Sequence, residues 1–355
     1  MHLFEPLSLR SGATLKNRFA LAPLTNLQSA PDGVLSDDEY KWLTMRAEGG
    51  FALTMTCAAS VQEEGVGFPG QLGFHDEEHL PGLTRLASGI KAQGSHAVAQ
   101  LHHGGLRALK APKGPSADEK LGAAAMTLDD IARARDCFIA AARRAERAGF
   151  DGVELHGAHG YLICAFLSAE LNRREDAYGG SPENRARLLF ELVDGVRAVT
   201  GASFSLGVRL SPERWGIALP EIVEVSQRLM HEAKIDYLDM SLWDARKEPN
   251  DEALQGRTLA SYFTGLERGA VRLGAAGKIT SAQDVRDVLA AGFDFALIGR
   301  GAILHHDFPK RVEADPNFAS IALPVSAAHL RAEGLGEPFI NYMRTWKGFV
   351  ADDAG

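Results

Sequence analysis

The sequence is poor in cysteine and has no long apolar run. Only Cys57, Cys137 and Cys164 occur among 355 residues, and no two have CxxC spacing. Neither a disulfide framework nor a zinc or iron-sulfur site is therefore predicted. No stretch approaches the roughly 18 to 20 apolar residues of a membrane span. The formal net charge is -8 with no long basic run, which argues against nucleic acid or an anionic membrane as a partner.

Two familiar sequence signals are also missing. Near the start, Glu5, Pro6 and Arg10 stand where the apolar region of a secretory signal would run, so we expect a cytoplasmic protein. No GxGxxG turn follows a strand, and "GAAGKIT" (274–280) lacks the first glycine of a P-loop at the required spacing. The open, doubly wound dinucleotide-binding fold is thus disfavoured.

The chain does contain eight short β-rich runs separated by segments of helical periodicity. The expected strands are 18–24, 51–58, 96–103, 152–158, 204–210, 237–243, 269–274 and 295–301. The expected helices are 35–49, 80–93, 127–149, 182–199, 218–233 and 281–292, with 105–126 as an inserted loop. Eight such units predict an α/β protein with a single (β/α)8 TIM barrel over residues 1–355. We expect the segment before the first strand to cap the barrel and a short tail to follow it at the C-terminus.

Polar residues cluster at the predicted strand ends, where barrel enzymes place their chemistry. They are Thr25, Gln100, His102, His103, His156, His159, Arg209 and Arg300. A single histidine is more often structural than catalytic, but several strand ends agree here. Because these ends meet at one mouth, we expect one functional site.

The stretch "VELHGAHGYL" (153–162) sets His156, His159 and Tyr161 close together, with glycines that let the chain turn. Two adjacent imidazoles suit a metal or a carbonyl oxygen, and the absence of a third ligand type nearby favours the carbonyl. The phenol of Tyr161 is placed to donate a proton to a developing carbanion.

The last two units indicate a phosphate site. Gly277 follows the seventh strand, and Gly299 with Arg300 follows the eighth, where barrels commonly bind phosphate. Arg209 lies in a very apolar strand; it is either a buried ion-pair partner or a fixed positive charge beside a group that becomes anionic.

Nearly the whole chain resembles the Old Yellow Enzyme (NADH:flavin oxidoreductase) family of FMN-containing barrels. The resemblance rests on "LKNRFALAPLT", "VAQLHHGG", "GFDGVELHGAHGYL", "LIGRG" and above all "FLSAELNRREDAYGGSPENRARL" (166–189). In that last block, paired charges predict a loop that supports the barrel mouth.

The resemblance implies how each residue acts. Pro23, Leu24, Thr25, Ala58, Gln100 and Arg209 would surround the flavin ring, and Gly277, Gly299 and Arg300 would hold the FMN phosphate. His156 and His159 would bind the carbonyl oxygen of an activated alkene. Flavin reduced by NADPH or NADH would pass a hydride to the β-carbon, and Tyr161 would protonate the α-carbon.

The tail motif "NYMRTW" (341–346) is similar to that of the bacterial thermophilic-like branch, which implies that Arg344 enters a neighbouring subunit's site in a dimer or tetramer. The chain departs from the branch at Thr25 and Leu27, often cysteine and tyrosine, and at Leu106, commonly arginine, although Arg107 is adjacent. Two alternatives stay open: an FMN-dependent amine dehydrogenase or demethylase, and a barrel that binds a phosphate ligand without redox turnover.

Overall fold

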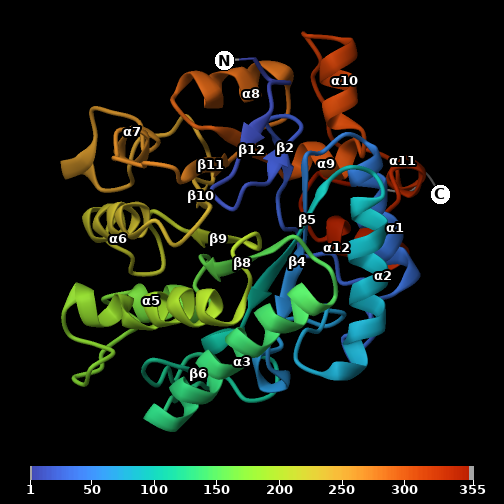
Figure 1. The fold of residues 1–355 in the computed structure, drawn as a ribbon. Coiled ribbons are helices and arrows are strands. Elements are labelled where there is room, and N and C mark those ends of the chain that lie inside the picture. The colour runs from blue at the N-terminus through green and yellow to red at the C-terminus, as the bar shows by residue number, and fades with distance from the viewer. Residues whose placement is uncertain (1, 352–355) are drawn as a thin grey trace.

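The computed structural model describes residues 2–351 and has a closed barrel of eight parallel strands (Figure 1). In order around the barrel these are β3 (Phe19–Leu21), β4 (Leu53–Ser60), β5 (His96–His102), β8 (Gly152–Gly157), β9 (Ser205–Leu210), β10 (Tyr237–Ser241), β11 (Arg272–Ala276) and β12 (Phe295–Ile298). Neighbours follow chain order, and β12 closes on β3. The predicted (β/α)8 barrel is confirmed.

Helices cover the outside of the barrel (Figure 1). The longer ones are α1 (Asp37–Glu48), α2 (Leu80–Lys91), α3 (Leu128–Arg147), α5 (Pro182–Val199), α6 (Leu219–Glu232) and α8 (Ala282–Ala290). Each begins and ends within two residues of its predicted range. Shorter helices are α4 (Leu162–Leu167), α7 (Ser261–Thr264), α9 (Arg300–Leu304), α10 (Phe308–Ala314), α11 (Ala327–Ala332) and α12 (Glu337–Arg344).

Helix α3 illustrates why these predictions succeed. The side chain of Thr127 accepts a hydrogen bond from the Asp130 amide, and the Asp130 carboxylate accepts one from the Thr127 amide; this reciprocal cap satisfies two backbone donors at the helix start. One face buries Ile131 and Phe138. Gly149 ends the helix with φ of 88°, a backbone conformation that glycine adopts without steric cost.

Strand β8 shows the alternation that builds the site. Val153 and Leu155 are fully buried in the outer hydrophobic core beneath the helices, so Glu154 and His156 point into the barrel. The seventh strand was expected at 269–274 but occupies Arg272–Ala276. The expectation was wrong at its start because residues 268–271 form a turn, in which Gly269 has φ of 54° and the Val271 amide bonds the Arg268 carbonyl.

Apolar residues close the bottom of the barrel. The hairpin of β1 (Leu7–Ser8) and β2 (Thr14–Leu15) contributes leucines to the same hydrophobic cluster as Leu53, Tyr237 and Phe295. A Cβ on Gly207 would lie 2.2 Å from the Tyr237 ring, so the missing side chain makes room for that ring inside the barrel. The polar interior residues therefore lie above this layer, toward the opposite end.

The inserted segment 105–126 is more ordered than expected. It contains η3 (Gly105–Arg107) and a small sheet of β6 (Lys113–Gly114) and β7 (Ala124–Ala125). Three further 3-10 turns are η1 (Glu63–Gly65), η2 (Glu77–His79) and η4 (Glu252–Leu254). In the neighbouring 166–189 block, Arg174 pairs with Asp176 at 2.5 Å, as predicted for a charge-paired loop, but Arg185 pairs outside the block with Glu221.

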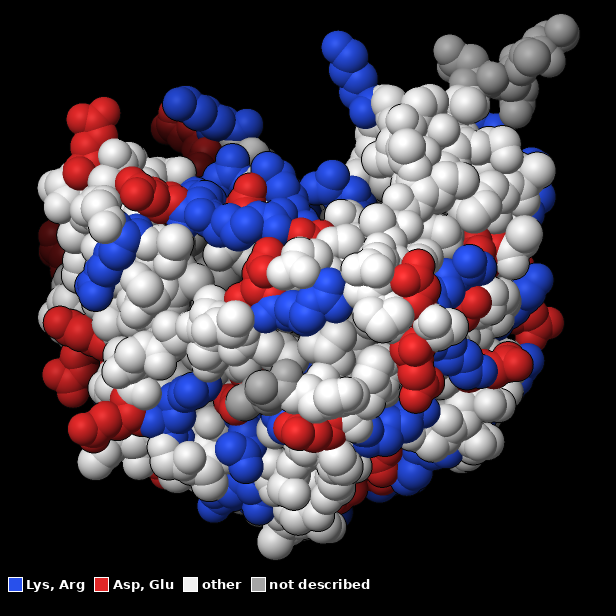
Figure 2. Space-filling view, turned by 90° about the horizontal axis from the view of Figure 1, so that it is seen from above, with Lys and Arg blue, Asp and Glu red and all other residues white. Residues whose placement is uncertain are grey.

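Charge is mixed on one face of the molecule. On the face shown in Figure 2, Lys and Arg side chains are interspersed with Asp and Glu. Within residues 2–351, no helix is both long enough and apolar enough to cross a membrane.

Candidate active site

One cavity lies at the C-terminal ends of the barrel strands. Its volume is about 440 Å³. Its lining includes Pro23, Leu24, Thr25, Ala58, Gln100, His156, His159 and Tyr161, all of which the sequence assigned to one site. The ends of strands β3, β4, β5 and β8 thus bring these residues together, as the strand-end argument predicts.

Two histidines and a tyrosine form one wall of the cavity. Nδ1 of His159 lies 3.2 Å from Nε2 of His156, and the ring centroids of His156 and Tyr161 are 5.3 Å apart. His159 has φ of 63°, which is uncommon for a residue with a side chain. Backbone strain of this kind is concentrated at functional sites.

The hydrogen bonds determine which nitrogen of each ring carries the proton. The Ala158 amide donates to Nδ1 of His156 at 3.4 Å, so Nε2 of His156 carries hydrogen and donates to His159. Nε2 of His159 then donates to Oγ of Ser241 at 2.8 Å. Both donors already have partners within the protein. An entering carbonyl oxygen must therefore replace those partners.

Burial keeps this wall uncharged. Desolvation, with smaller contributions from neighbouring positive groups, lowers the pKa of His156 and of His159 well below the usual range. Burial also raises the pKa of Tyr161, although Arg107 opposes that shift. At neutral pH the wall therefore presents neutral imidazoles and an un-ionised phenol, all of which can donate hydrogen bonds.

Beneath the cavity lies a buried charged layer. Nε2 of Gln100 donates to Oε1 of Glu154 at 2.7 Å, and Nε of Arg209 lies 3.2 Å from Oδ2 of Asp239 without hydrogen-bond geometry. Burial raises the pKa of Glu154 to about 8 and that of Asp239 to about 6, and Arg209 opposes both shifts. Two carboxyl groups thus share one guanidinium in this layer, which favours one retained proton.

A smaller cavity of about 110 Å³ continues from the first and shares Pro23 and Leu24 with it. Arg209, Gly277, Gly299 and Arg300 line it. A Cβ on Gly299 would meet no atom nearer than 3.6 Å, so the backbone there is open to a ligand. Arg300 is exposed at the start of α9.

These two cavities fit the chemistry of FMN. Gln100 and Arg209 present an amide and a guanidinium beside a largely apolar surface of Pro23, Leu24 and Ala58, which suits a planar ring with a polar edge. The second cavity then offers glycine backbone and Arg300, which suit a phosphate. The predicted cofactor residues therefore form one continuous surface.

The sequence analysis assigned no role to several residues of the cavity. Aromatic and cationic side chains form its rim: Arg107, Trp215, Trp243, Tyr342 and Trp346. Trp215 and Trp243 have φ of 50° and 66°, a conformation that no pattern in the sequence signals. Asp239 could have been found, since Tyr237, Asp239 and Ser241 alternate along one strand and must share its inward face.

Three other residues that the sequence analysis named lie outside the lining of the 440 Å³ cavity. Arg344 ends α12 with its side chain exposed and donates from Nη1 to Asn341 at 2.7 Å. Leu106 is buried beneath Gly114, so it presents no side chain to this cavity, whereas the adjacent Arg107 does. Leu27, with φ of 57°, lines a separate hollow of about 920 Å³.

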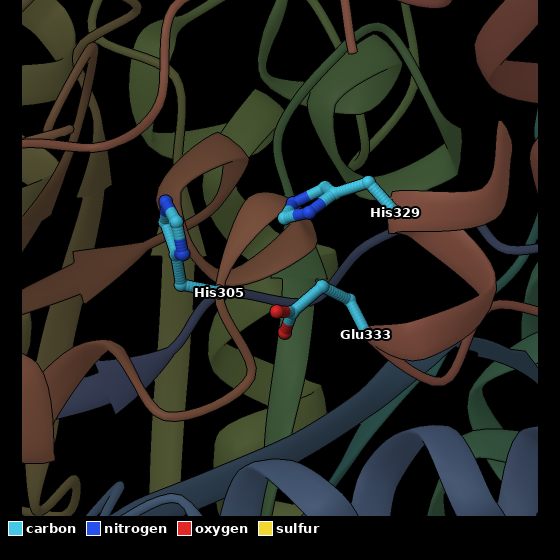
Figure 3. A group of neighbouring side chains, drawn as sticks. All are labelled: His305, His329 and Glu333. Carbon is cyan, nitrogen blue, oxygen red and sulfur yellow. The ribbon is translucent and has the colours of Figure 1, made fainter. Parts of the chain in front are cut away.

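A second polar cluster consists of His305, His329 and Glu333, whose side chains point toward one gap (Figure 3). Nε2 of His305 accepts from the Ile321 amide at 3.1 Å, so its buried, unpartnered Nδ1 carries hydrogen. Nε2 of His329 faces the carbonyl of Leu304 at 2.8 Å, which leaves a lone pair on Nδ1. One donor and two acceptors match a water molecule better than the three lone pairs that a metal requires.

Comparison with known proteins agrees with the fold and with the family that the sequence motifs indicate. The chain is 35% identical to a probable NADH-dependent flavin oxidoreductase, YqiG, of Bacillus subtilis, over 88% of this chain and 87% of that protein. It is 35% identical to an NADPH dehydrogenase of Bacillus licheniformis, over 87% and 93%. The structure of an Old Yellow Enzyme homologue from Zymomonas mobilis superposes with a TM-score of 0.79 at 28% identity, covering 93% of this chain and 96% of that one.

The sequence model of one family matches residues 2–317, which is most of the chain. The resemblance inferred from the sequence motifs is thereby confirmed. The matched region contains every predicted flavin and catalytic position but ends before the tail with Arg344. The chain belongs to the NADH:flavin oxidoreductase / NADH oxidase family.

Proposed function

We propose that this flavin oxidoreductase is an ene-reductase, which reduces the activated C=C bond of an α,β-unsaturated carbonyl compound or a similar alkene with electrons from NADPH or NADH. The observation that supports this most is the wall of His156, His159 and Tyr161 beside the surface of Gln100 and Arg209. A carbonyl anchor and a proton donor face the same space as the cofactor surface.

FMN, when bound, supplies the hydride for the β-carbon of the alkene. The residues proposed to hold its ring and phosphate are Pro23, Leu24, Thr25, Ala58, Gln100, Arg209, Gly277, Gly299 and Arg300. In this arrangement Arg209 would provide a buried positive charge to stabilise the negative charge that a flavin ring gains on reduction.

The protein's own groups complete the addition. The Nε2 hydrogens of His156 and His159 turn from their internal partners to the carbonyl oxygen and stabilise the charge that develops there. Tyr161 gives its phenolic proton to the α-carbon, and solvent reprotonates the phenolate. The alkene thus gains one hydride and one proton, and the raised pKa of Tyr161 keeps that proton available.

We further propose a cytoplasmic homo-oligomer, a dimer or tetramer, in which Arg344 approaches the site of a neighbouring subunit. Its exposed position at the end of α12 is compatible with this contact. The small-molecule alkene is the proposed substrate, and no metal enters the proposed reaction.

The function is tested by following flavin absorbance without oxygen. Purified protein is mixed with NADPH, and separately with NADH, and 2-cyclohexenone is then added to the reduced enzyme. Bleaching by the nicotinamide followed by prompt recovery with the enone is expected. Protein that carries no flavin and binds none contradicts the proposal. Bleaching without recovery would instead favour the oxidative reactions of amine dehydrogenases or demethylases.

A further inference from the structure

Arg107 has no role in the reaction as proposed, yet it lies at the edge of the catalytic wall. It is the last residue of η3 and lines the same cavity as His156, His159 and Tyr161. Its side chain is exposed at the mouth. It nevertheless contacts His159 and Tyr161 in the loop after β8. Since Arg107 itself follows β5, it links the segments that follow these two barrel strands.

The first contact stabilises the strained backbone of His159. Nη1 of Arg107 donates to the His159 carbonyl at 2.8 Å, and the His159 amide donates to Oγ of Ser211 at 3.0 Å. Both backbone polar groups of a residue with φ of 63° are therefore held by hydrogen bonds to side chains distant in sequence. Such a conformation persists only when its surroundings enforce it, and the direction of the His159 ring depends on it.

The second contact is with the proton donor. The guanidinium carbon of Arg107 lies 4.6 Å from the centroid of the Tyr161 ring, within the range of an attractive cation-π contact. The same positive charge opposes the rise in the pKa of Tyr161 that burial causes. Arg107 thus acts on both the placement and the acidity of the phenol.

The local backbone allows one arginine to make both contacts. Gly105 has φ of 60°, and a Cβ there would lie 2.9 Å from the Leu162 backbone. The Leu162 amide also donates to the His103 carbonyl at 3.2 Å. The turn η3 therefore packs directly against the loop that carries the catalytic residues. A planar guanidinium has several donors in fixed directions and can also lie over a ring, which an ammonium cannot do equally well.

We infer that Arg107 is a positioning residue that holds His159 through its carbonyl and Tyr161 through its ring in the geometry needed for carbonyl binding and proton donation. The inference rests on the proposed function for its catalytic consequence, but the contact with Tyr161 can be measured without any substrate.

The substrate-free test uses holoenzyme labelled with tyrosine carrying ¹³C at Cζ. The Tyr161 signal is assigned with Tyr161→Phe, and its titration is followed by NMR in the native protein, Arg107→Gln and Arg107→Lys. The control, Lys110→Gln, removes a positive charge three residues away whose partner is Glu63. Tyr161 should titrate at higher pH in Arg107→Gln, less so in Arg107→Lys, and unchanged in Lys110→Gln. An unchanged Tyr161 titration in Arg107→Gln overturns the inference.

The second measurement is the rate at which 2-cyclohexenone reoxidises the reduced holoenzyme across pH. Arg107→Gln should react about tenfold to a hundredfold more slowly, with its alkaline limb shifted to higher pH and normal FMN content. Lys110→Gln should behave as the native protein. If native protein is not reoxidised at all, the proposed function fails and the NMR result alone decides the inference. If native protein and Arg107→Gln react alike, the inference fails and the function stands.

Discussion

At the scale of single residues, the site depends on groups that stay neutral. His156 and Tyr161 are kept uncharged at physiological pH because burial disfavours their charged forms. A neutral imidazole donates a hydrogen bond to a carbonyl without introducing a charge that must be desolvated. A neutral phenol retains the proton that it must deliver. The two halves of the proposed reaction can therefore be separated by substitution.

Replacing Tyr161 with Phe should slow reoxidation of the enzyme by the alkene without slowing its reduction by the nicotinamide. The ring and its packing against His102, at 4.3 Å between centroids, are retained, and only the hydroxyl is lost. Reoxidation of the reduced enzyme by 2-cyclohexenone should slow by about a hundredfold or more, because a positioned general acid contributes on that scale. Reduction by NADPH should change little. Stopped-flow absorbance measures both rates, and equal slowing of both would contradict a proton-donor role.

Glu154 should make stability depend on pH. Its pKa is about 8 in the folded protein, against an ordinary value of 4.5. The folded state therefore binds this proton more tightly than the unfolded state does. The stabilisation is fully present below about pH 4.5 and is lost as pH rises through 8. Glu154→Gln removes this titration and keeps an acceptor for Gln100, while Asp239 retains Arg209 as its partner.

The expected result is that native protein loses more unfolding free energy between pH 5 and 8 than Glu154→Gln does. Urea denaturation at a series of pH values measures it. Glu170→Gln is the control, because it removes an exposed carboxyl group after α4. Parallel curves for native protein and Glu154→Gln would show that Glu154 does not hold a proton in this range.

At the scale of elements, the repeating patterns were predictable and the loop conformations were not. Periods of two and 3.6 residues, with caps such as Thr127, located the strands and helices because those patterns follow from burial on one face. Strand ends then placed His156 and Arg209 near one another. Trp243 lies in a loop and has a left-handed backbone conformation, and Arg107 lies in the turn η3, where its contact is distant in sequence. No local pattern encodes such contacts.

Gly105 tests whether the contact between η3 and the loop after β8 matters. Gly105→Ala adds a Cβ at 2.9 Å from the Leu162 backbone at a residue with φ of 60°. We expect a loss of about 2 to 3 kcal/mol in unfolding free energy and slower reoxidation by enone, because η3 must move away from the catalytic loop. Gly122→Ala is matched to it: φ is 62° in the same segment, with nothing within 4 Å. It should cost only about 1 kcal/mol. Equal losses in denaturation would mean that the contact with Leu162 adds nothing.

At the scale of the whole molecule, the barrel and the tail contribute differently to the site. Strand ends supply the floor and the catalytic wall. Helix α12 supplies Tyr342 and Met343 to the lining of the same chain's cavity, and Trp346, two residues after the helix, joins its rim. Arg344 lies between these rim residues but is exposed and does not line that cavity. Since neighbours on a helix point in different directions, Arg344 can lie next to lining residues without lining the cavity itself, as the proposed contact with a neighbouring subunit requires.

Subunit mixing tests this arrangement. Arg344→Ala and Tyr161→Phe proteins should each turn over 2-cyclohexenone poorly. If Arg344 acts across a dimer interface, a mixed dimer contains one site with intact Tyr161 from one subunit and intact Arg344 from the other. Random mixing makes half of the dimers mixed, with one good site of two, so turnover should recover to about a quarter of the native value. Differently tagged subunits verify that mixing has occurred. No recovery in verified mixed dimers would mean that Arg344 acts within its own chain. In that case each site of a mixed dimer still carries one substitution, either Arg344→Ala or Tyr161→Phe.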